Sequence, residues 1–412
     1  MSNAVLGGGD KVGQVGEHFT DSQNKDSRFR NISGIWTAQC KTFDEGLAIL
    51  EDQQSEIQDI EAPLSRFSPR VSDAGKFVFY DHETGRSYEP TKHALNNIAV
   101  VGGSSSWQLS DLATDRENTA VRSDNSVKRD SGDAELLAHI VSHTMFHPKR
   151  LDQKKVRLFR TWKDGSLRAV LSSQYAIVNN VWYLSVLKDL IPGGMLSHWR
   201  GDADTIFGNV LIPDTIRQES DSAYGGMLSV GNSEIGLRRI FSLPSVFRAI
   251  CMNGCIWSQK KGEVVSKVHR GAIDLTQLKL AIEKNLKAQI PLLDDGIKHM
   301  LGIRGRGFGN AAVNQMFAEL ARTFNISKKG MIGVRSAFDV EVGILGNAAK
   351  TAFGLVQAVT RYGQELSASE WFEYDKTAGK ITMQSDNEWN NMRARAALVT
   401  DDKEIARRIG NF

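Results

Sequence analysis

The sequence predicts an α+β protein: an antiparallel sheet and hairpin core with flanking helices, followed by a helical C-terminal third. Two strand-rich stretches, 156–172 and 206–270, precede a long stretch in which apolar residues recur at helical spacing. Strands and helices therefore occupy separate parts of the 412-residue chain. A doubly wound parallel sheet, in which they would alternate, is not expected.

The strongest local signal is a β-hairpin. Val156–Trp162 and Ser166–Ser172 are rich in strand-forming residues, and residues 163–165 between them supply a turn that ends in glycine. A helix is expected just before the hairpin, over 134–146, and a shorter helix after it, over 181–190.

Further elements follow in the middle and at the end of the chain. After Gly271 the apolar residues step by three and four, which predicts one long helix over 275–297. Asp274 is expected to cap this helix and Pro291 to kink it. Additional strands are expected over 207–216, 226–231, 239–241, 247–256 and 263–268, and additional helices over 310–324 and 347–362.

Composition divides the chain into four expected regions. Residues 1–30 are rich in Gly, Ser, Asp and Asn and are expected to form a disordered head. Residues 31–133 are expected to be a loosely ordered acidic region that contains a polar linker over 102–132. A basic α+β core is expected over 134–300 and a helical region over 301–412.

Charge is distributed unevenly, although the net charge of the chain is only +3. Residues 1–153 contain 16 Lys/Arg and 23 Asp/Glu, whereas residues 154–310 contain 22 Lys/Arg and 13 Asp/Glu. A basic middle section suits an acidic partner such as nucleic acid, and a solvated basic face gives the same count.

The cellular compartment is expected to be the cytoplasm. The longest apolar runs fall short of the roughly 18 residues that a membrane span needs, and the N-terminus lacks the pattern of a signal peptide. The three cysteines, Cys40, Cys251 and Cys255, are too few for a disulfide framework, which suits a reducing compartment.

Five short segments carry a resemblance to a known family and span roughly residues 135–365. They read LRAVLSSQY at 167–175, GNSEIG at 231–236, FRAICMNG at 247–254, HRG at 269–271, and TAFG with AVTRY within 351–362. In these segments and in their order the chain resembles the uncharacterised phage/plasmid-like proteins grouped as domain of unknown function 932. The resemblance implies a mobile-element protein in a bacterial cytoplasm, and it implies no catalytic mechanism. Several proteins that accompany such proteins in mobile elements act on DNA, which favours a nucleic-acid-binding function by association.

Two segments place cations where a nucleic-acid ligand could use them. Cations and aromatic residues are interleaved on and near the hairpin, where charges would follow the backbone and rings would stack on bases. A second segment, Gly302 to Gly309, combines glycines with two arginines, which suits close approach to phosphate, although a flexible helix connector has the same composition. The candidate nucleic-acid-binding residues are Arg157, Arg160, Arg168, Arg200, Arg304 and Arg306.

A polar motif lies among the predicted strands. Its sequence favours a tight turn in which Asn and Ser bond the backbone and Gly236 takes a positive φ. The alternative is a functional polar pocket, although no pair of nucleophile and base can be assigned. The residues of the motif and of the alternative pocket are Asn232, Ser233, Glu234, Gly236, Arg248, Asn253, Gly254 and His269.

Histidines on the predicted helix at 134–146 are the candidates for a metal site. His139 and His143 are four residues apart, a spacing at which two imidazoles can share Zn²⁺ or Ni²⁺. No further ligands are placed to complete such a site, so a polar helix face without metal is the expected interpretation. Cys251 and Cys255 are likewise expected to be structural.

The leading functional hypothesis is a non-catalytic, single-strand nucleic-acid-binding protein of a mobile element, with strand annealing or protection as its role. The expected partners are single-stranded DNA or RNA, a second copy of the chain and a host protein, with no membrane and no cofactor. One alternative is a metal-assisted nuclease or nucleotide-processing enzyme built on the histidines or on Glu234. Another is a host-interaction protein that inhibits a bacterial defence system.

Overall fold

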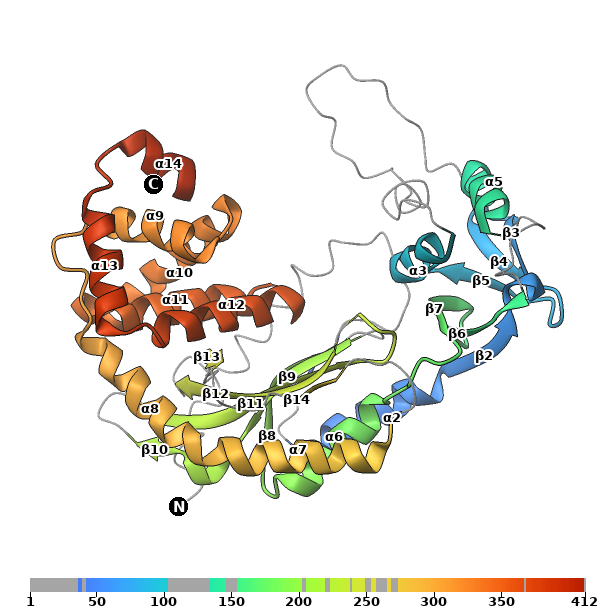
Figure 1. Ribbon diagram of the computed structural model, residues 1–412, viewed down its shortest axis with the longest axis horizontal. Coiled ribbons are helices and arrows are strands. Elements are labelled where there is room, and N and C mark those ends of the chain that lie inside the picture. The colour runs from blue at the N-terminus through green and yellow to red at the C-terminus, as the bar shows by residue number, and fades with distance from the viewer. Residues whose placement is uncertain are drawn as a thin grey trace.

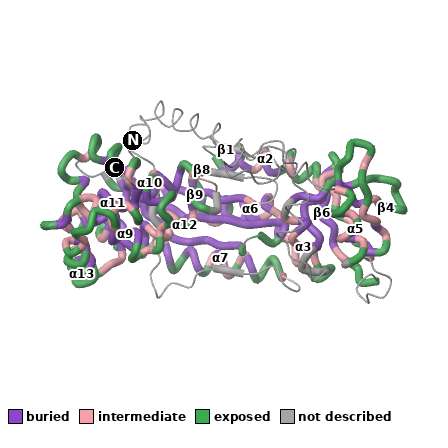
Figure 2. Tube along the Cα trace, turned by 90° about the horizontal axis from the view of Figure 1, so that it is seen from above, coloured by how far each residue is buried: buried purple, intermediate pink, exposed green. Residues whose placement is uncertain are grey.

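The computed structural model describes residues 36–38, 42–102, 134–145, 154–201, 205–218, 223–237, 239–248, 253–256, 265–267, 273–366 and 368–410. These residues form two β-sheets and a helical C-terminal part, which confirms the predicted α+β class. The three parts lie in a row along the long axis, with the larger sheet in the middle (Figure 1 and Figure 2). The predicted head and linker lie outside the described residues, apart from Gly102.

The sheet at one end of the row contains the predicted hairpin. Its strand order is β2-β6-β7-β5-β4-β3, with β5 parallel to β7 and the other pairs antiparallel. Helices α3 (Lys92–Gly102) and α5 (Ala134–Met145) pack on this sheet around an apolar core. The strands are β2 (Ile57–Pro63), β3 (Phe67–Val71), β4 (Phe77–Asp81), β5 (Ser87–Pro90), β6 (Val156–Trp162) and β7 (Ser166–Ser172).

Residues 31–133 were expected to be loosely ordered, and this prediction is wrong for residues 43–102. Strand β2 pairs with β6 from Ile57↔Trp162 to Pro63↔Val156, so both halves of this sheet are needed to complete it. Phe67 and Phe79 are buried in its core. Polar turns between these short strands dilute the apolar content of the region, which is why composition alone suggested weak order. The expected boundary at 133/134 therefore divides one sheet.

The central sheet is antiparallel and has the order β1-β8-β9-β11-β12-β13, with β10 pairing to β11 and β14 to β12. The predicted strand over 247–256 is wrong, because Arg248 ends β12 and pairs with Asn253, the first residue of β13. The predicted strand over 207–216 ends early, because a 3-10 turn begins at Pro213. The strands are β1 (Trp36–Ala38), β8 (Met195–Gly201), β9 (Thr205–Leu211), β10 (Arg217–Gln218), β11 (Ala223–Ser233), β12 (Ile240–Arg248), β13 (Asn253–Ile256) and β14 (Val265–Lys267).

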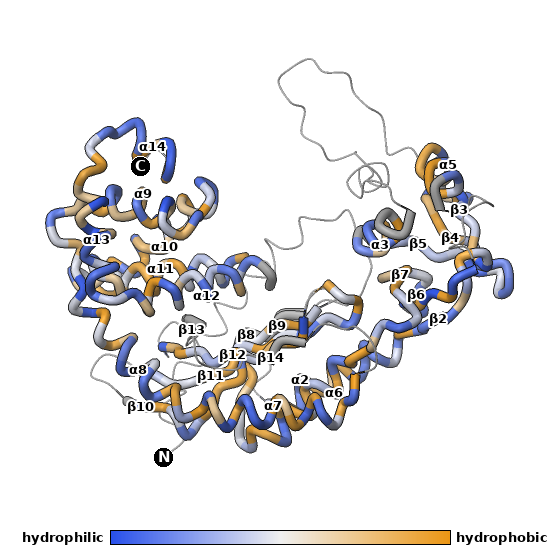
Figure 3. The backbone as a smooth tube through the Cα atoms, viewed as in Figure 1, coloured by the Kyte–Doolittle hydropathy of each residue, from blue (hydrophilic) through white to orange (hydrophobic). Residues whose placement is uncertain are grey.

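Helices α2 (Phe43–Ser55), α6 (Asn180–Leu190) and α7 (Leu275–Gln289) contribute to the apolar core on one face of the central sheet. Figure 3 shows apolar and polar residues alternating along α7, as expected for a helix with one buried face. The Asp274 carboxylate accepts hydrogen bonds from two backbone N–H groups of α7, which confirms the predicted cap. Pro291 interrupts the helix as predicted, and α8 (Leu293–Gly302) continues beyond a short 3-10 turn.

The C-terminal part consists of helices packed around α11 (Ala352–Gln364), which is buried along most of its length. The predicted helices at 310–324 and 347–362 correspond to α9 and α11, whereas the others were not predicted individually. They are α9 (Val313–Phe324), α10 (Lys328–Leu345), α12 (Ala368–Thr382), α13 (Asp386–Ala397) and α14 (Asp402–Ile409). Among the described helices, none has the length and apolar character that crossing a bilayer demands.

Close packing at Gly226 holds the central sheet against α8. A Cβ atom at this position would lie 2.4 Å from Leu293 Cδ1 and 2.9 Å from Leu293 Cβ. We predict that Gly226→Ala lowers the free energy of unfolding by about 1–3 kcal/mol, because the extra methyl overpacks the contact. The control is Gly302→Ala, since a Cβ there meets no atom within 4 Å. Urea denaturation measures both variants, and equal stability of the two would contradict the prediction.

Candidate functional site

The structure buries the hairpin residues that were expected to contact nucleic acid. The side chains of Arg160 and Arg168 are 2% and 0% exposed. Phe159 and Trp162 are also buried. In this conformation these four side chains offer no surface to a ligand, so the predicted binding surface on the hairpin is wrong for them.

The two remaining hairpin-region candidates are placed differently. Arg157 is half-buried in β6. Arg200 lies in β8, where it pairs with Phe207 of β9, and its side chain is outside the described residues. Arg157 does not join Arg160 and Arg168 in the contacts described below.

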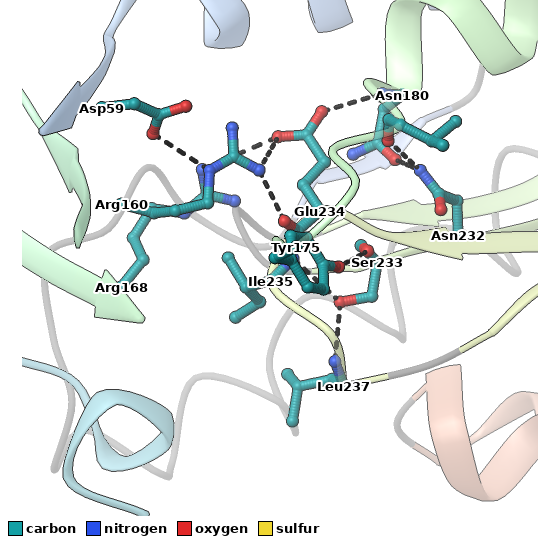
Figure 4. A network of polar contacts seen from close by, with 11 residues as sticks. Asp59, Arg160, Arg168, Tyr175, Asn180, Asn232, Ser233, Glu234, Ile235 and Leu237 are labelled. Carbon is teal, nitrogen blue, oxygen red and sulfur yellow. Dashed lines mark hydrogen bonds and ion pairs between the residues drawn. The ribbon is translucent and has the colours of Figure 1, made fainter. Parts of the chain in front are cut away.

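Arg160 and Arg168 point toward the turn between β11 and β12, where they meet the polar motif (Figure 4). Arg160 Nη1 donates a 2.5 Å hydrogen bond to the Glu234 carbonyl oxygen and lies 3.6 Å from Glu234 Oε2. Arg168 Nη1 lies 3.7 Å from the same carboxylate oxygen. On its other side, Arg160 Nε donates to Asp59 Oδ1 at 3.0 Å. Two buried guanidinium groups therefore face two carboxylates, and we call this set the junction cluster.

The second oxygen of Glu234 connects the junction cluster to the start of α6. Glu234 Oε1 accepts a 2.8 Å hydrogen bond from the backbone N–H of Asn180. Asn232 Nδ2 donates at 2.8 Å to both Asn180 Oδ1 and the Val178 carbonyl. The cluster thus ties together the six-stranded sheet that contains the hairpin (the N-terminal sheet), the β11–β12 turn and α6.

The polar motif forms the tight turn that the sequence predicted. Ser233 Oγ accepts hydrogen bonds from the backbone N–H groups of Ile235 and Leu237, at 3.3 Å and 3.0 Å. Gly236 has a φ of 81°, a region that favours glycine, which confirms the expected positive φ. Because the Ser233 hydroxyl serves the backbone in this way, it completes the turn.

Two titratable side chains close over the turn. The Tyr175 hydroxyl donates to the Ser233 carbonyl at 3.2 Å, and burial raises the pKa of Tyr175, so the phenol remains protonated. His93 Nε2 lies 2.8 Å from the Ile235 carbonyl, and burial lowers the pKa of His93. A neutral His93 at pH 7 donates from Nε2 to that carbonyl. Both groups stabilise the turn by hydrogen bonding.

The structure does not gather the other polar candidates at the turn. Arg248 is paired with Tyr224 at the far end of the β11–β12 ladder, about 25 Å away at the usual strand rise. Asn253 and Gly254 lie opposite that end in β13, and His269 is outside the described residues. The alternative of one polar pocket that includes Arg248 is therefore wrong, because the strand ladder separates it from Glu234.

His139 and His143 lie on α5 with their rings stacked at a centroid distance of 6.5 Å. Both side chains are exposed. In the part of the chain that the structure describes, no group of three His, Cys, Asp or Glu side chains is arranged to hold a metal ion.

The segment from Gly302 to Gly309 lies at an open groove of about 730 Å³ between α8 and α13. Gly302 and Gly305 line the groove, and a Cβ atom at either position would meet no atom of the described residues within 4 Å. Lys298 and Arg393 supply further cations to the same walls. We call this set the glycine-arginine groove.

The two arginines of the segment have different surroundings. Arg306 lines the groove, donating from Nε to Asp386 Oδ1 at 2.8 Å and from Nη1 to the Gln384 carbonyl at 2.6 Å. Arg304 instead hydrogen-bonds the Tyr224 hydroxyl, and its guanidinium lies 4.8 Å from the centre of the Phe353 ring. The segment is therefore a packed connection rather than a flexible one, and its candidate cation in the groove is Arg306.

The sequence did not lead us to predict that α13 forms one side of the groove. Trp389, Asn390 and Arg393 all come from this helix. The signal was present, because Ser385 and Glu388 form a capping box at the start of α13. That α8 and α13, which are far apart in the chain, line one groove could not be derived from that signal.

The junction cluster generates a test that separates a structural from a catalytic Glu234. We predict that Glu234→Gln lowers the free energy of unfolding by about 3 kcal/mol, because two buried guanidinium groups lose a compensating charge. Glu56→Gln is the control, since Glu56 and Lys163 form a half-exposed pair at 3.2 Å, worth at most about 1 kcal/mol. Urea denaturation compares them, and an equally small effect of both would contradict a structural role.

Comparisons of the chain with models of protein families, with curated proteins and with solved structures give no match. The resemblance to phage/plasmid-like proteins over roughly residues 135–365 thus stays a prediction. What can be inferred about function rests on the geometry of the glycine-arginine groove and the junction cluster.

Proposed function

We propose that the protein binds single-stranded nucleic acid without catalysis, and that the glycine-arginine groove holds the phosphate backbone. The observation that carries this proposal is the meeting of three cations and two unobstructed glycines in one open groove. Backbone phosphates are recognised by such cations and by exposed main chain. Arg160 and Arg168 play no part in this binding, because they are buried in the junction cluster.

Arg393 is the cation that is most available to a ligand. Among the described residues it has no ion pair or hydrogen bond. A Cβ atom on Gly309 would lie 2.9 Å from Arg393 Cδ, so the glycine makes room for this side chain. A guanidinium held in this way can donate two parallel hydrogen bonds to one phosphate.

The other two cations of the groove are each near an acid. Lys298 lies 3.7 Å from Asp295, and both are well exposed, so the pair is weak and a phosphate can compete for the lysine. Arg306 is held more firmly by Asp386, which directs its guanidinium along the groove wall. The two carboxylates repel phosphate and so limit the affinity of the groove. Binding is therefore expected to be moderate, and it should be salt-sensitive because it depends on cation–phosphate contacts.

The shape of the groove favours a single strand and little sequence preference. A volume of about 730 Å³ is in the range that encloses a drug-sized ligand, comparable to a short stretch of one strand. Trp389 lines the groove but is 1% exposed, so its ring offers no stacking platform for a base. Contacts would therefore be made to phosphates, which carry no sequence information.

Binding should weaken with salt in proportion to these few contacts. With three cations engaged, we expect a slope of about −2 for log affinity against log salt on single strands. Arg393→Ala should reduce the magnitude of this slope by about 0.7, because one phosphate contact is lost. Arg407→Ala on α14 is the matched control, since Arg407 is exposed and does not line the groove. Fluorescence anisotropy of a labelled oligonucleotide over a salt series measures all three proteins.

A steric variant tests the place of binding independently of charge. At Gly305 a Cβ atom meets no described atom within 4 Å, so Gly305→Leu should project a bulky side chain into the groove and weaken binding while the Tm is retained. Ala48→Leu adds the same side chain to an exposed position on α2 and should bind like the wild type. Failure of the wild type to bind DNA or RNA at low salt would overturn the proposed function. Normal binding by Gly305→Leu would overturn the assignment to this groove.

A further inference from the structure

Helix α10 carries an exposed apolar stripe that its own chain leaves uncovered among the described residues. Eleven large hydrophobic side chains are exposed in that part of the structure, and four of them belong to this one helix. Ile332, Val340 and Ile344 are 43%, 50% and 44% exposed. Spacings of four and eight place them on one side of the helix, together with Ser336 and Gly343. Apolar residues concentrated in this way mark an interaction surface.

We propose that this stripe is the interface of a symmetric homodimer, in which α10 packs antiparallel against α10 of a second copy. When the two-fold axis passes at Ser336, the apolar stripe of one copy is complementary to the same stripe of the second copy. Ile332 then faces Val340 of the second copy, and position 328 faces position 344. A two-fold interface requires this reciprocity, since each contact occurs twice.

The charge distribution of α10 favours a second copy of the helix, in antiparallel orientation, as the partner of the stripe. The helix has no acidic residue in its first turn and no basic residue in its last turn, the reverse of what stabilises an isolated helix. Lys328 and Lys329 instead add positive charge beside the positive helix N-terminus. In the antiparallel dimer both lysines lie beside the last turn of the other copy, where the helix carries its negative partial charge.

Small residues allow the two helices to approach. Ser336 lies at the axis, and a Cβ atom on Gly343 would meet no atom of the described residues within 4 Å. Gly343 therefore leaves space for Lys329 of the second copy, which faces it across the axis. A helix of 18 residues is about 27 Å long, so one helix pair buries less than the roughly 800 Å² per partner of a standard interface. The dimer is accordingly expected to form reversibly as protein concentration rises.

Sedimentation velocity over a concentration series tests the dimer. The wild type should shift from one chain to two, whereas the double variant Ile332→Glu with Val340→Glu should remain monomeric with unchanged helix content by circular dichroism. Leu280→Glu is the matched control, because Leu280 is 51% exposed on α7, and it should dimerise like the wild type. A wild type that stays monomeric, or a double variant that still dimerises, would overturn the proposal.

Cysteine cross-linking tests the antiparallel geometry. Ser336→Cys places two thiols together at the axis, so mild oxidation should yield a disulfide-linked dimer. Thr276→Cys on α7 and the wild type, which contains only Cys40, Cys251 and Cys255, should give no comparable product. A dimer that forms in sedimentation while Ser336→Cys fails to cross-link would overturn the arrangement about Ser336.

Discussion

The buried charges of the junction cluster are the interaction on which the arrangement of the two sheets depends. Arg160 and Arg168 come from the N-terminal sheet, whereas Glu234 lies in a turn of the central sheet. Removing these ions from water is costly, and attraction offsets the cost only when the remaining polar atoms are also bonded. The Glu234 carbonyl, the Asn180 backbone N–H and Asp59 supply such bonds. The contact is therefore directional, and it fixes the hairpin against the turn in one orientation.

This constraint distinguishes two sets of cations, the junction-cluster arginines and the groove cations, which have different roles. Arg160 and Arg168 are used inside the protein, where their partners are carboxylates and a carbonyl oxygen. The cations of the glycine-arginine groove line an open surface beside two glycines, and Arg393 has no acid partner among the described residues. Only the second group can contact a polyanion without disturbing the fold. The basic character of residues 154–310 therefore reflects both internal pairing and surface charge.

Local features of the fold could be predicted from the sequence, and non-local ones could not. The hairpin, the Asp274 cap and the break at Pro291 depend on a few neighbouring residues, and all were predicted. The pairing of β2 with β6 and the approach of α13 to α8 join segments far apart in the chain, and they were missed. Arg160 and Arg168 were wrongly predicted to bind nucleic acid. Alternating cations and aromatic residues are common both to single-strand binders and to strands that carry a buried ion pair. Only the position of Glu234 distinguishes the two.

The most direct test of this account is photo-cross-linking of the full-length protein to a short single-stranded oligonucleotide with photoreactive bases, followed by mass spectrometry of the cross-linked peptides. The account predicts adducts in the peptides that line the groove, at 295–307 and 386–393. It predicts none in the hairpin at 156–172, where Arg160 and Arg168 are buried. Adducts confined to the hairpin would contradict it, because the junction cluster would then have to open for the ligand to bind.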